Sequence, residues 1–182
     1  MAEAAHVPDV KLICGMISAD RRLFDEAAKA LAPVFGEVDL ASEVMDFDFT
    51  HYYDQQMGSP LYRKFISFAD LISPEAIVEA KLLTNALECD FASRPEGSPP
   101  RPINLDPGYV ESAKLVLVSM KNFSHRIYLG KAVYAEVTLL YRKGDWEPLP
   151  WTFPDFASPR YHPFLTAARQ QLRRQLVEGD QP

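Results

Sequence analysis

Side chains that can transfer protons or bind ligands are concentrated in three short stretches of the sequence. The first runs from Asn104 to Tyr109 and contains Asp106, which is followed by Pro107 and Gly108. Asn and Asp bond backbone groups in turns, and Pro and Gly favour tight turns, so a structural turn explains this stretch. The alternative is that Asp106 projects into a site as a general base or a cation ligand. Tyr109 is then a candidate ligand-binding residue.

The second stretch, 121–128, combines Lys121 with the adjacent pair His125 and Arg126. Histidine titrates near neutral pH and suits proton transfer, while arginine offers a planar fork for carboxylate or phosphate. The pair stands at the start of an expected strand, so the two side chains should point to opposite faces and only one should line a given pocket. The alternative for His125 is a buried histidine held by a neighbouring carboxylate.

Glu136 supplies the matching carboxylate on a strand that follows. In this strand Tyr134, Glu136 and Thr138 share one face, and the apolar residues between Val133 and Leu139 share the other. A carboxylate among apolar neighbours needs a partner if it is buried. If Glu136 lies across from the His125–Arg126 step, the pair is either part of a site or a cross-strand salt bridge.

The third stretch is the aromatic segment from Trp151 to Phe156, which contains Asp155. It can act as a lid over a ligand or as a hydrophobic clasp on the sheet. Aromatic rings can also stack on nucleic-acid bases, but no lysine or arginine is interleaved with these rings, which disfavours a nucleic-acid partner. Trp151 and Asp155 are therefore candidate ligand-binding residues.

Several motifs that imply a particular cofactor do not occur in the sequence, among them the Walker phosphate loop, the GxGxxG turn, the HExxH zinc helix and the GxSxG elbow. No standard cofactor is implied. Metal binding by Asp106, His125 and Glu136 is a further alternative, although these residues lack a typical ligand spacing.

Composition places the chain among globular proteins. Of its 182 residues, 47% are hydrophobic and 24% are charged, which fits a single domain over 1–182 with flexible ends at about 1–8 and 178–182. A net charge of −6 opposes non-specific attraction to nucleic acid or anionic lipid. Cys14 and Cys89 stand among apolar residues without a CxxC pair and are expected to be reduced core residues. We expect a cytoplasmic protein that does not engage a membrane.

Hydrophobic periodicity predicts the elements that must position these residues. A buried central strand is expected over Val10–Ile17 and a helix from the Ser18-Ala19-Asp20 cap to Gly36. Ser73-Pro74 begins a second helix that runs to about Glu88, with Ile77, Leu83 and Leu87 facing the sheet. Further strands are expected over Glu43–Phe49, Leu61–Phe68 and Leu115–Met120.

The second half of the chain is expected to be rich in strands. Ser124–Leu129 and Val133–Arg142 form a hairpin that turns at Gly130-Lys131, and Ser158-Pro159 begins a last helix. Asp106-Pro107 also resembles a helix start, which favours a helical turn that passes into a strand. The expected fold is α+β: a mostly antiparallel sheet with helices packed on it, in ferredoxin-like β-α-β-β-α-β order with an added hairpin and a C-terminal helix.

Six motifs together resemble the prokaryotic family of uncharacterised proteins known as domain of unknown function 4416. They are Asp48–Tyr53, Met57-Gly58, Asn104–Tyr109, His125–Tyr128, Tyr134–Leu139 and Trp151–Phe156. The resemblance covers most of the chain from about Val10 to the last helix. It implies a bacterial or archaeal cytoplasmic protein and supplies no activity.

The leading functional hypothesis is a pocket for a small anionic ligand, such as a nucleotide or a phosphorylated metabolite. Lys121, Arg126 and His125 would line it, with Asp106 and Glu136 available for acid–base chemistry. The rival hypothesis is a non-enzymatic module in which loops around Tyr52, Tyr53 and Trp151 bind a protein or RNA. Convergence of Asp106, His125 and Glu136 within about 4 Å in a concave pocket would favour chemistry, and dispersal over the surface would favour an interface.

Overall fold

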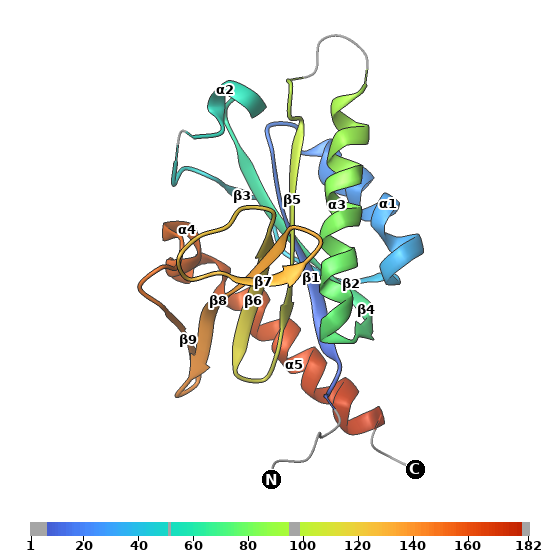
Figure 1. Cartoon of the computed structure of the whole chain (residues 1–182), viewed down its shortest axis with the longest axis vertical. Helices are drawn as coiled ribbons and strands as arrows, with labels where there is room; N and C mark the ends of the chain where they lie inside the picture. The colour runs from blue at the N-terminus through green and yellow to red at the C-terminus, as the bar shows by residue number, and fades with distance from the viewer. Residues whose placement is uncertain (1–6, 51, 95–98, 180–182) are drawn as a thin grey trace.

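The computed structural model describes residues 7–50, 52–94 and 99–179. Within this part of the chain a nine-stranded sheet and five α-helices form an α+β fold (Figure 1). The elements in chain order are β1 (Val10–Ser18), α1 (Arg22–Phe35), β2 (Val38–Ala41), β3 (Met45–Asp46), α2 (Asp54–Met57), β4 (Tyr62–Ile72), the 3-10 turn η1 (Pro74–Ala76), α3 (Ile77–Ala92), β5 (Ile103–Val110), β6 (Lys114–Ser119), β7 (Ile127–Gly130), β8 (Val133–Arg142), β9 (Asp145–Pro148), α4 (Pro154–Ala157), the 3-10 turn η2 (Pro159–Tyr161) and α5 (His162–Gly179).

The strands lie in the order β2-β4-β1-β5-β6-β8-β7, and each neighbouring pair is antiparallel. The short β3 pairs with β4, and β9 pairs with β8. The central position of β1 confirms the expectation of a buried strand, because all nine of its residues are buried. The expected mostly antiparallel sheet is therefore confirmed.

Helices pack on both faces of the sheet. Alternate β1 residues Leu12, Cys14 and Met16 belong to a core cluster that also contains buried residues of α1 and α3. Ile13 belongs to a second cluster that contains buried residues of α5. Successive strand residues face opposite sides of a sheet. Helices α1 and α3 therefore cover one face and α5 covers the other (Figure 1).

The two long helices of the first half begin and end where their sequence signals stand. The Asp20 carboxylate accepts a hydrogen bond from the Arg22 backbone N–H at 3.0 Å, and α1 ends at Gly36, whose φ of 90° suits glycine. Pro74 opens η1, and α3 follows it directly. Ile77 is buried, and Leu83 and Leu87 pack partly buried against the same core cluster. The predicted starts of both helices and the inward-facing residues are confirmed, whereas α3 continues past the expected end at Glu88 to Ala92.

The helical turn expected after Asp106-Pro107 is wrong. Residues 103–110 form one uninterrupted strand, β5, which pairs with β1 along its whole length. Pro107 is tolerated because β6 pairs only with Gly108–Val110. The other edge of β5 is thus free of a strand partner before Gly108, and proline has no N–H to leave unpaired there.

Two further expectations need correction. Only Met45–Asp46 (β3) of the strand expected over Glu43–Phe49 forms a strand. The longer β2 (Val38–Ala41) was not predicted. In β8 the register against β6 shifts at Thr138, which adds one residue to the strand. Val133 and Ala135 therefore pack in the cluster under α1 and α3, whereas Leu139 packs in the cluster under α5. A strict alternation from Val133 to Leu139 does not hold, because a bulge reverses the faces.

The hairpin of β7 and β8 is confirmed, with Ile127 opposite Ala135 and Gly130 opposite Val133. Its turn residues are Lys131 and Ala132, both at positive φ, one residue later than predicted. The expected flexible ends fall largely on residues 1–6 and 180–182, which lie outside the described residues. None of the helices in the described part of the chain has both the length and the hydropathy needed to cross a membrane.

Candidate functional site

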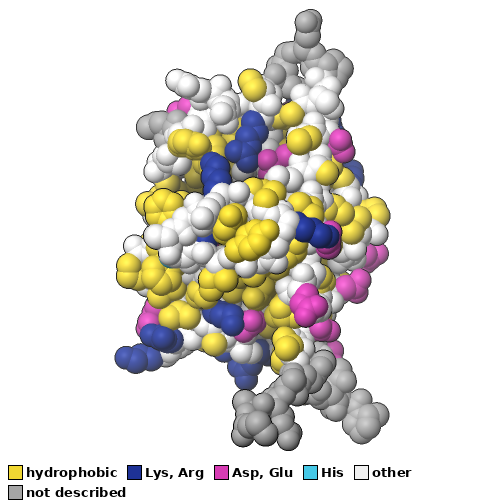
Figure 2. Space-filling model, in the orientation of Figure 1, with side chains coloured by type: hydrophobic (Ala, Val, Ile, Leu, Met, Phe, Trp, Pro, Cys, Tyr) yellow, Lys and Arg dark blue, Asp and Glu magenta, His cyan; other side chains and the backbone are white. Residues whose placement is uncertain are grey.

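A cavity of about 1120 Å³ opens where β5 and β6 separate. Its walls come from β4, α3, β5, the segment after β6, β8 and the segments around Tyr52 and Trp151. Figure 2 shows Lys and Arg side chains gathered above the centre of this face, between α2 and α3, next to hydrophobic side chains. The cavity lining contains five Lys and Arg residues and four Asp and Glu residues. What the cavity can bind depends on which of these charged groups already have a partner in the protein.

Side chains of α3 bond the edge of β5 that β6 leaves open. Lys81 Nζ donates to the Leu105 carbonyl at 3.0 Å, and the Leu105 N–H donates to Glu88 Oε1 at 2.7 Å. These bonds replace the strand neighbour that is missing at this point, so the separation of the two strands leaves no unpaired backbone group at Leu105. They also place Lys81 and Glu88 in the cavity lining.

Arg63 on β4 is a buried charge in the cavity wall, with 3% of its surface exposed. Its Nη2 donates to Asp155 Oδ2 at 2.7 Å. Within the described residues, however, neither Nε nor Nη1 has a hydrogen-bond partner, although both are buried. Burial acts to lower the pKa of Arg63, but Asp155, Tyr161 and Asp106 raise it above its ordinary value. The guanidinium is therefore charged, and the rings of Phe47, Phe65, Phe156 and Tyr161 surround it, with centroids 5.1–5.7 Å from Cζ.

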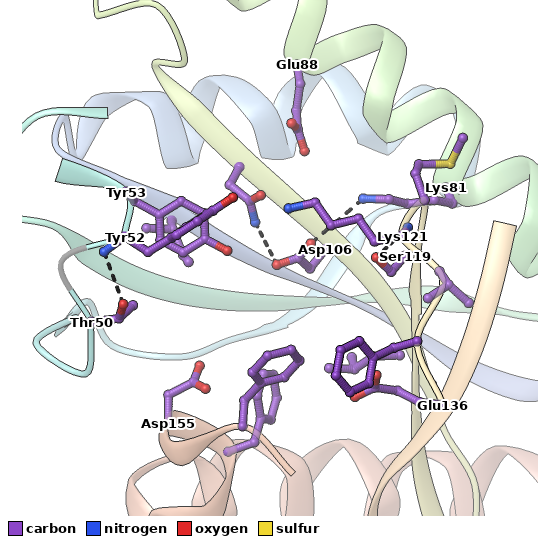
Figure 3. Close-up of a pocket in the computed structure, with 18 of the residues that line it drawn as sticks. Thr50, Tyr52, Tyr53, Lys81, Glu88, Asp106, Ser119, Lys121, Glu136 and Asp155 are labelled. Carbon is purple, nitrogen blue, oxygen red and sulfur yellow. Dashed lines mark hydrogen bonds and ion pairs between the residues drawn. The ribbon is translucent and has the colours of Figure 1, made fainter. Parts of the chain in front are cut away.

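Asp106 lies between the two buried cations and forms a long ion pair with each. Its carboxylate is 3.9 Å from Arg63 Nη1 and 3.8 Å from Lys81 Nζ, while Asn104 Nδ2 donates to Oδ2 at 2.6 Å. Its side chain is 34% exposed. In Figure 3 the ammonium ends of Lys81 and Lys121 are both directed toward the middle of the cavity, where Asp106 lies.

Arg101 and Glu88 close the upper side of this cluster. Arg101 donates to Glu88 Oε2 at 3.0 Å and also bonds the side-chain oxygen of Asn104. Burial raises the pKa of Glu88, against the opposing effect of Lys81 and of the bond from Leu105. Burial and the charge of Asp106 also raise the pKa of Tyr53. Burial therefore disfavours the charged forms of Glu88 and Tyr53, while the neighbouring cations favour them.

A second cluster is built around the buried Glu136. His125 Nε2 and Arg126 Nε both lie within hydrogen-bond distance of Glu136 Oε2, at 2.9 and 2.7 Å. Arg126 Nη1 also donates to Ser119 Oγ and to the Lys121 carbonyl. The expectation that His125 and Arg126 point to opposite faces is wrong, because β7 begins only at Ile127 and the pair lies in a turn.

The Trp151 segment is fastened to β8 and also lines the cavity. Trp151 Nε1 donates to the Val137 carbonyl at 2.8 Å, and Thr152 Oγ1 donates to the Thr138 carbonyl at 2.5 Å. The Trp151 ring stacks on His125 with 5.4 Å between centroids. The segment therefore clasps the sheet, and its rings form one wall of the cavity.

A protein-family model described as "Domain of unknown function (DUF4416)" matches residues 8–172. The chain belongs to this family. Searches of curated proteins and of solved structures give no significant match. The DUF4416 match spans every residue that we place in the cavity, and it assigns no activity to any of them.

Seven of the eight sequence-predicted site residues of this DUF4416 chain line the cavity: Asp106, Lys121, His125, Arg126, Glu136, Trp151 and Asp155. His125 and Glu136 are in contact, and Asp106 belongs to the separate cluster with Arg63 and Lys81. Tyr109 does not line the cavity, because it lies beyond the point where β6 joins β5 and pairs with Val116. The metal alternative finds no support, since the described residues contain no group of three or more His, Cys, Asp or Glu side chains that could hold a metal ion.

The residues that sequence reasoning missed are Arg63, Lys81, Glu88, Arg101 and Asn104. Arg63 alternates with Leu61 and Phe65 on one face of its strand, and Lys81 stands four residues after Ile77 on the apolar face of its helix. A charge on an otherwise apolar face was the available signal. Cys89 was expected in the core but is exposed and lines the cavity. Neighbouring helix residues point in different directions, so the apolar residues near Cys89 in sequence do not surround it. Cys14 is buried, as expected.

Proposed function

We propose that the cavity binds a small anionic ligand, a nucleotide or another phosphorylated metabolite. The observation that carries this proposal is the pair of buried, unpartnered donors on Arg63, which is charged and lines the cavity. A buried donor without a partner costs about 1–3 kcal/mol, and more on a charged group. Both nitrogens are closed to solvent, so a ligand oxygen satisfies them only when the side chains around Arg63 shift to admit it. Arg–oxyanion bonds are among the stronger hydrogen bonds in proteins.

Lys121 supplies a cation without a carboxylate partner among the described residues of the cavity lining. Its Nζ lies 5.4 Å from the centre of the Tyr52 ring, and no hydrogen bond or ion pair joins that Nζ to another described residue. Each of the four carboxylates in the lining, by contrast, accepts a hydrogen bond. The charged groups of the lining that lack a hydrogen-bond partner are therefore donors, which favours an anionic ligand.

For the acid–base part of the proposal, His125 is the group that moves a proton, and Glu136 holds its ring. Glu136 is buried and bonded to both His125 and Arg126, so it acts as a positioning residue. Asp106 is the more accessible carboxylate and can accept a hydrogen bond from a ligand hydroxyl. Arg126 is committed to Glu136, Ser119 and the Lys121 carbonyl, and it holds the Lys121 segment in place.

The test is a titration with inorganic phosphate and pyrophosphate, followed by calorimetry and thermal unfolding. We expect both anions to raise Tm, because a ligand of the folded state stabilises it in proportion to the logarithm of its concentration over Kd. Lys121→Ala should weaken binding severalfold, and Lys29→Ala on exposed α1 is the matched control. Absence of binding at millimolar anion, or equal effects of the two lysine variants, would contradict the proposal.

The rival candidate is an interaction module, and one observation favours it. The edge strand β7 carries Ile127, Tyr128 and Leu129, whose exposed fractions are 71%, 60% and 42%. Exposed apolar residues on an edge strand are typical of a surface that pairs with another chain. Ile127→Lys should then abolish association with that chain while leaving phosphate binding unchanged, as judged by sedimentation and calorimetry.

Two further parts of the proposal concern fold and location. We propose that β1, β2, β4 and β5, with α1 and α3, form a ferredoxin-like unit, and the antiparallel order β2-β4-β1-β5 supports it. A solved structure of a DUF4416 member that aligns this unit with a ferredoxin-like domain tests the assignment. A prokaryotic cytoplasmic location is supported by the two free cysteines, and thiol labelling of the protein in intact and lysed cells tests it.

A further inference from the structure

Exposed aromatic side chains are concentrated at the mouth of the cavity. Five aromatic residues in the described part of the chain are exposed, and four of them, Tyr52, Phe123, Trp151 and Phe153, line the cavity. Only Tyr128 lies elsewhere. An exposed aromatic ring gains nothing from the solvent, so such a concentration marks a surface that another molecule covers.

The volume of the cavity also exceeds what a bare anion needs. About 1120 Å³ is slightly above the range for pockets that take drug-sized ligands, roughly 300–1,000 Å³. A phosphate ion has no flat apolar surface to place against the rings. The ligand that matches both the cations and the rings is one that joins a phosphate to a planar group.

The Phe123–Trp151 wall is built before any ligand arrives. The Trp151 ring is nearly parallel to that of His125, at 10°, and the Phe123 ring lies 5.3 Å from His125. The bond from Trp151 Nε1 to the Val137 carbonyl fixes the indole further. A planar ligand that stacks here therefore pays little conformational entropy in the protein.

We propose that the ligand is a nucleoside phosphate, whose base stacks on the Phe123–Trp151 wall while Arg63 and Lys121 bind its phosphate. The partly exposed carboxylate of Asp106 accepts a hydrogen bond from a ribose hydroxyl. This inference rests on the proposed function, because it names the class of the anion that the cavity binds. Base stacking on aromatic side chains contributes about 1–3 kcal/mol, so the base should raise affinity by about 5- to 150-fold.

The first experiment compares nucleoside 5′-monophosphates of adenosine, guanosine, cytidine and uridine with ribose 5-phosphate by calorimetry. Ribose 5-phosphate keeps the phosphate and the sugar and lacks only the base. We expect at least one nucleotide to bind about 10-fold or more tightly than ribose 5-phosphate. Phe123→Ala should weaken binding of that nucleotide and leave the affinity for ribose 5-phosphate unchanged.

Tryptophan fluorescence supplies an independent readout of stacking. Trp151 is 39% exposed at the cavity, whereas Trp146 is 2% exposed and its Nε1 donates to Thr166. The nucleotide should quench the protein fluorescence, Trp151→Phe should remove most of that quenching, and the matched variant Trp146→Phe should retain it. Quenching that survives in Trp151→Phe would overturn the proposed stacking.

The outcomes separate this inference from the proposed function. Equal affinities for the nucleotides and for ribose 5-phosphate would overturn the nucleotide assignment and leave anion binding intact. Failure of phosphate, ribose 5-phosphate and all four nucleotides to bind would overturn both. Binding of an oligoribonucleotide without binding of any monophosphate would also overturn the inference and would favour an RNA-binding surface.

Discussion

Lys11 and Arg63 are two buried cations on the same pair of strands, and they differ in how their donors are used. Lys11 stands opposite Leu71 at one end of the β1–β4 pair, and Arg63 stands opposite Ile17 at the other end. Their exposed fractions are 0% and 3%. Lys11 Nζ bonds Asp39 at 2.5 Å, Gln175 at 2.8 Å and the Ala69 carbonyl at 3.5 Å. Arg63 has one hydrogen-bonded nitrogen, Nη2, while Nε and Nη1 have no hydrogen-bond partner among the described residues and Nη1 makes only the long ion pair with Asp106.

The difference shows how to separate a structural charge from a site in a fold of unknown function. An ammonium group has three donors, and those of Lys11 tie β1 to β2, to β4 and to α5. Arg63 has five donors and stands beside a cavity with most of them unused. Burial alone therefore does not distinguish the two residues, whereas the count of satisfied donors does.

The largest effect is expected from Lys11→Met. The substitution leaves Asp39 without its charged partner and removes the link to α5, and breaking a buried pair in this way costs about 3–5 kcal/mol. Chemical denaturation should show this loss in the free energy of unfolding. Phosphate affinity, measured on the protein that remains folded, should not change. A loss below about 1 kcal/mol would break the comparison, because Lys11 would then not be a structural tie.

The second effect is expected from the paired substitution Arg63→Met with Asp155→Leu. Replacing both members of a buried ion pair by apolar residues of similar size is often neutral for stability, so Tm should stay close to that of the wild type. Phosphate binding should weaken by about 10- to 150-fold, the equivalent of about 1.5–3 kcal/mol for hydrogen bonds to a charged group. The double substitution is needed because Arg63→Met alone would leave the buried Asp155 unpaired.

A double variant that still binds phosphate as tightly as the wild type would show that the unused donors of Arg63 do not bind an anion. The corresponding pair on the other cation, Lys11→Met with Asp39→Leu, is the matched control. It removes a buried charge pair of the same kind away from the cavity and should leave binding intact.

Much of the fold was predictable because its signals are local. The apolar run of β1, the Ser73-Pro74 start before α3 and the β7–β8 hairpin each follow from a few neighbouring residues. The continuous strand through Pro107 could not be predicted, because it depends on β6 leaving the edge of β5 at Gly108. The faces of β8 could not be predicted either, because the bulge at Thr138 appears only in its pairing with β6.

The candidate site shows the same division. His125, Arg126 and Glu136 were grouped correctly since the hairpin brings them together, although their turn geometry was wrong. Arg63 and Lys81 were missed because their meeting with Asp106 joins β4, α3 and β5. Tyr109 was placed in the site by its neighbourhood to Asp106 in sequence, but β6 covers that end of the strand.

A third and smaller effect, on stability, is expected from Arg126→Ala. Like Lys11, the buried Glu136 is bonded to its neighbours, and Arg126 is one of these partners. The variant leaves the buried Glu136 with His125 as its partner, and the loss of hydrogen bonds to a charged group should cost about 1–3 kcal/mol. Urea denaturation measures this cost, with Arg142→Ala on the exposed end of β8 as the control. Equal stability of the two variants would mean that the Glu136 cluster does not contribute to folding.

The smallest effect is expected from Glu88→Gln. Glu88 accepts hydrogen bonds from Arg101 and from the Leu105 N–H, as a structural charge does, but it also lines the cavity, as Arg63 does. Burial raises the pKa of Glu88 in the folded protein above its ordinary value of 4.5. The folded state therefore holds a proton that the unfolded state has already lost, and stability from this group is complete below pH 4.5 and falls as the pH rises through the folded pKa. In Glu88→Gln this part of the pH dependence should disappear, while the amide oxygen can still accept the bond from Leu105.

The free energy of unfolding at pH 7 should change by less than about 1 kcal/mol, and the wild type should lose more stability than the variant between pH 4.5 and pH 7. Denaturation curves across that range, with exposed Glu75→Gln as the control, measure the difference. If the two curves stay parallel, the carboxylate of Glu88 is fully compensated by Lys81 and Arg101, and the cavity is less hostile to negative charge on that side than the burial of Glu88 indicates.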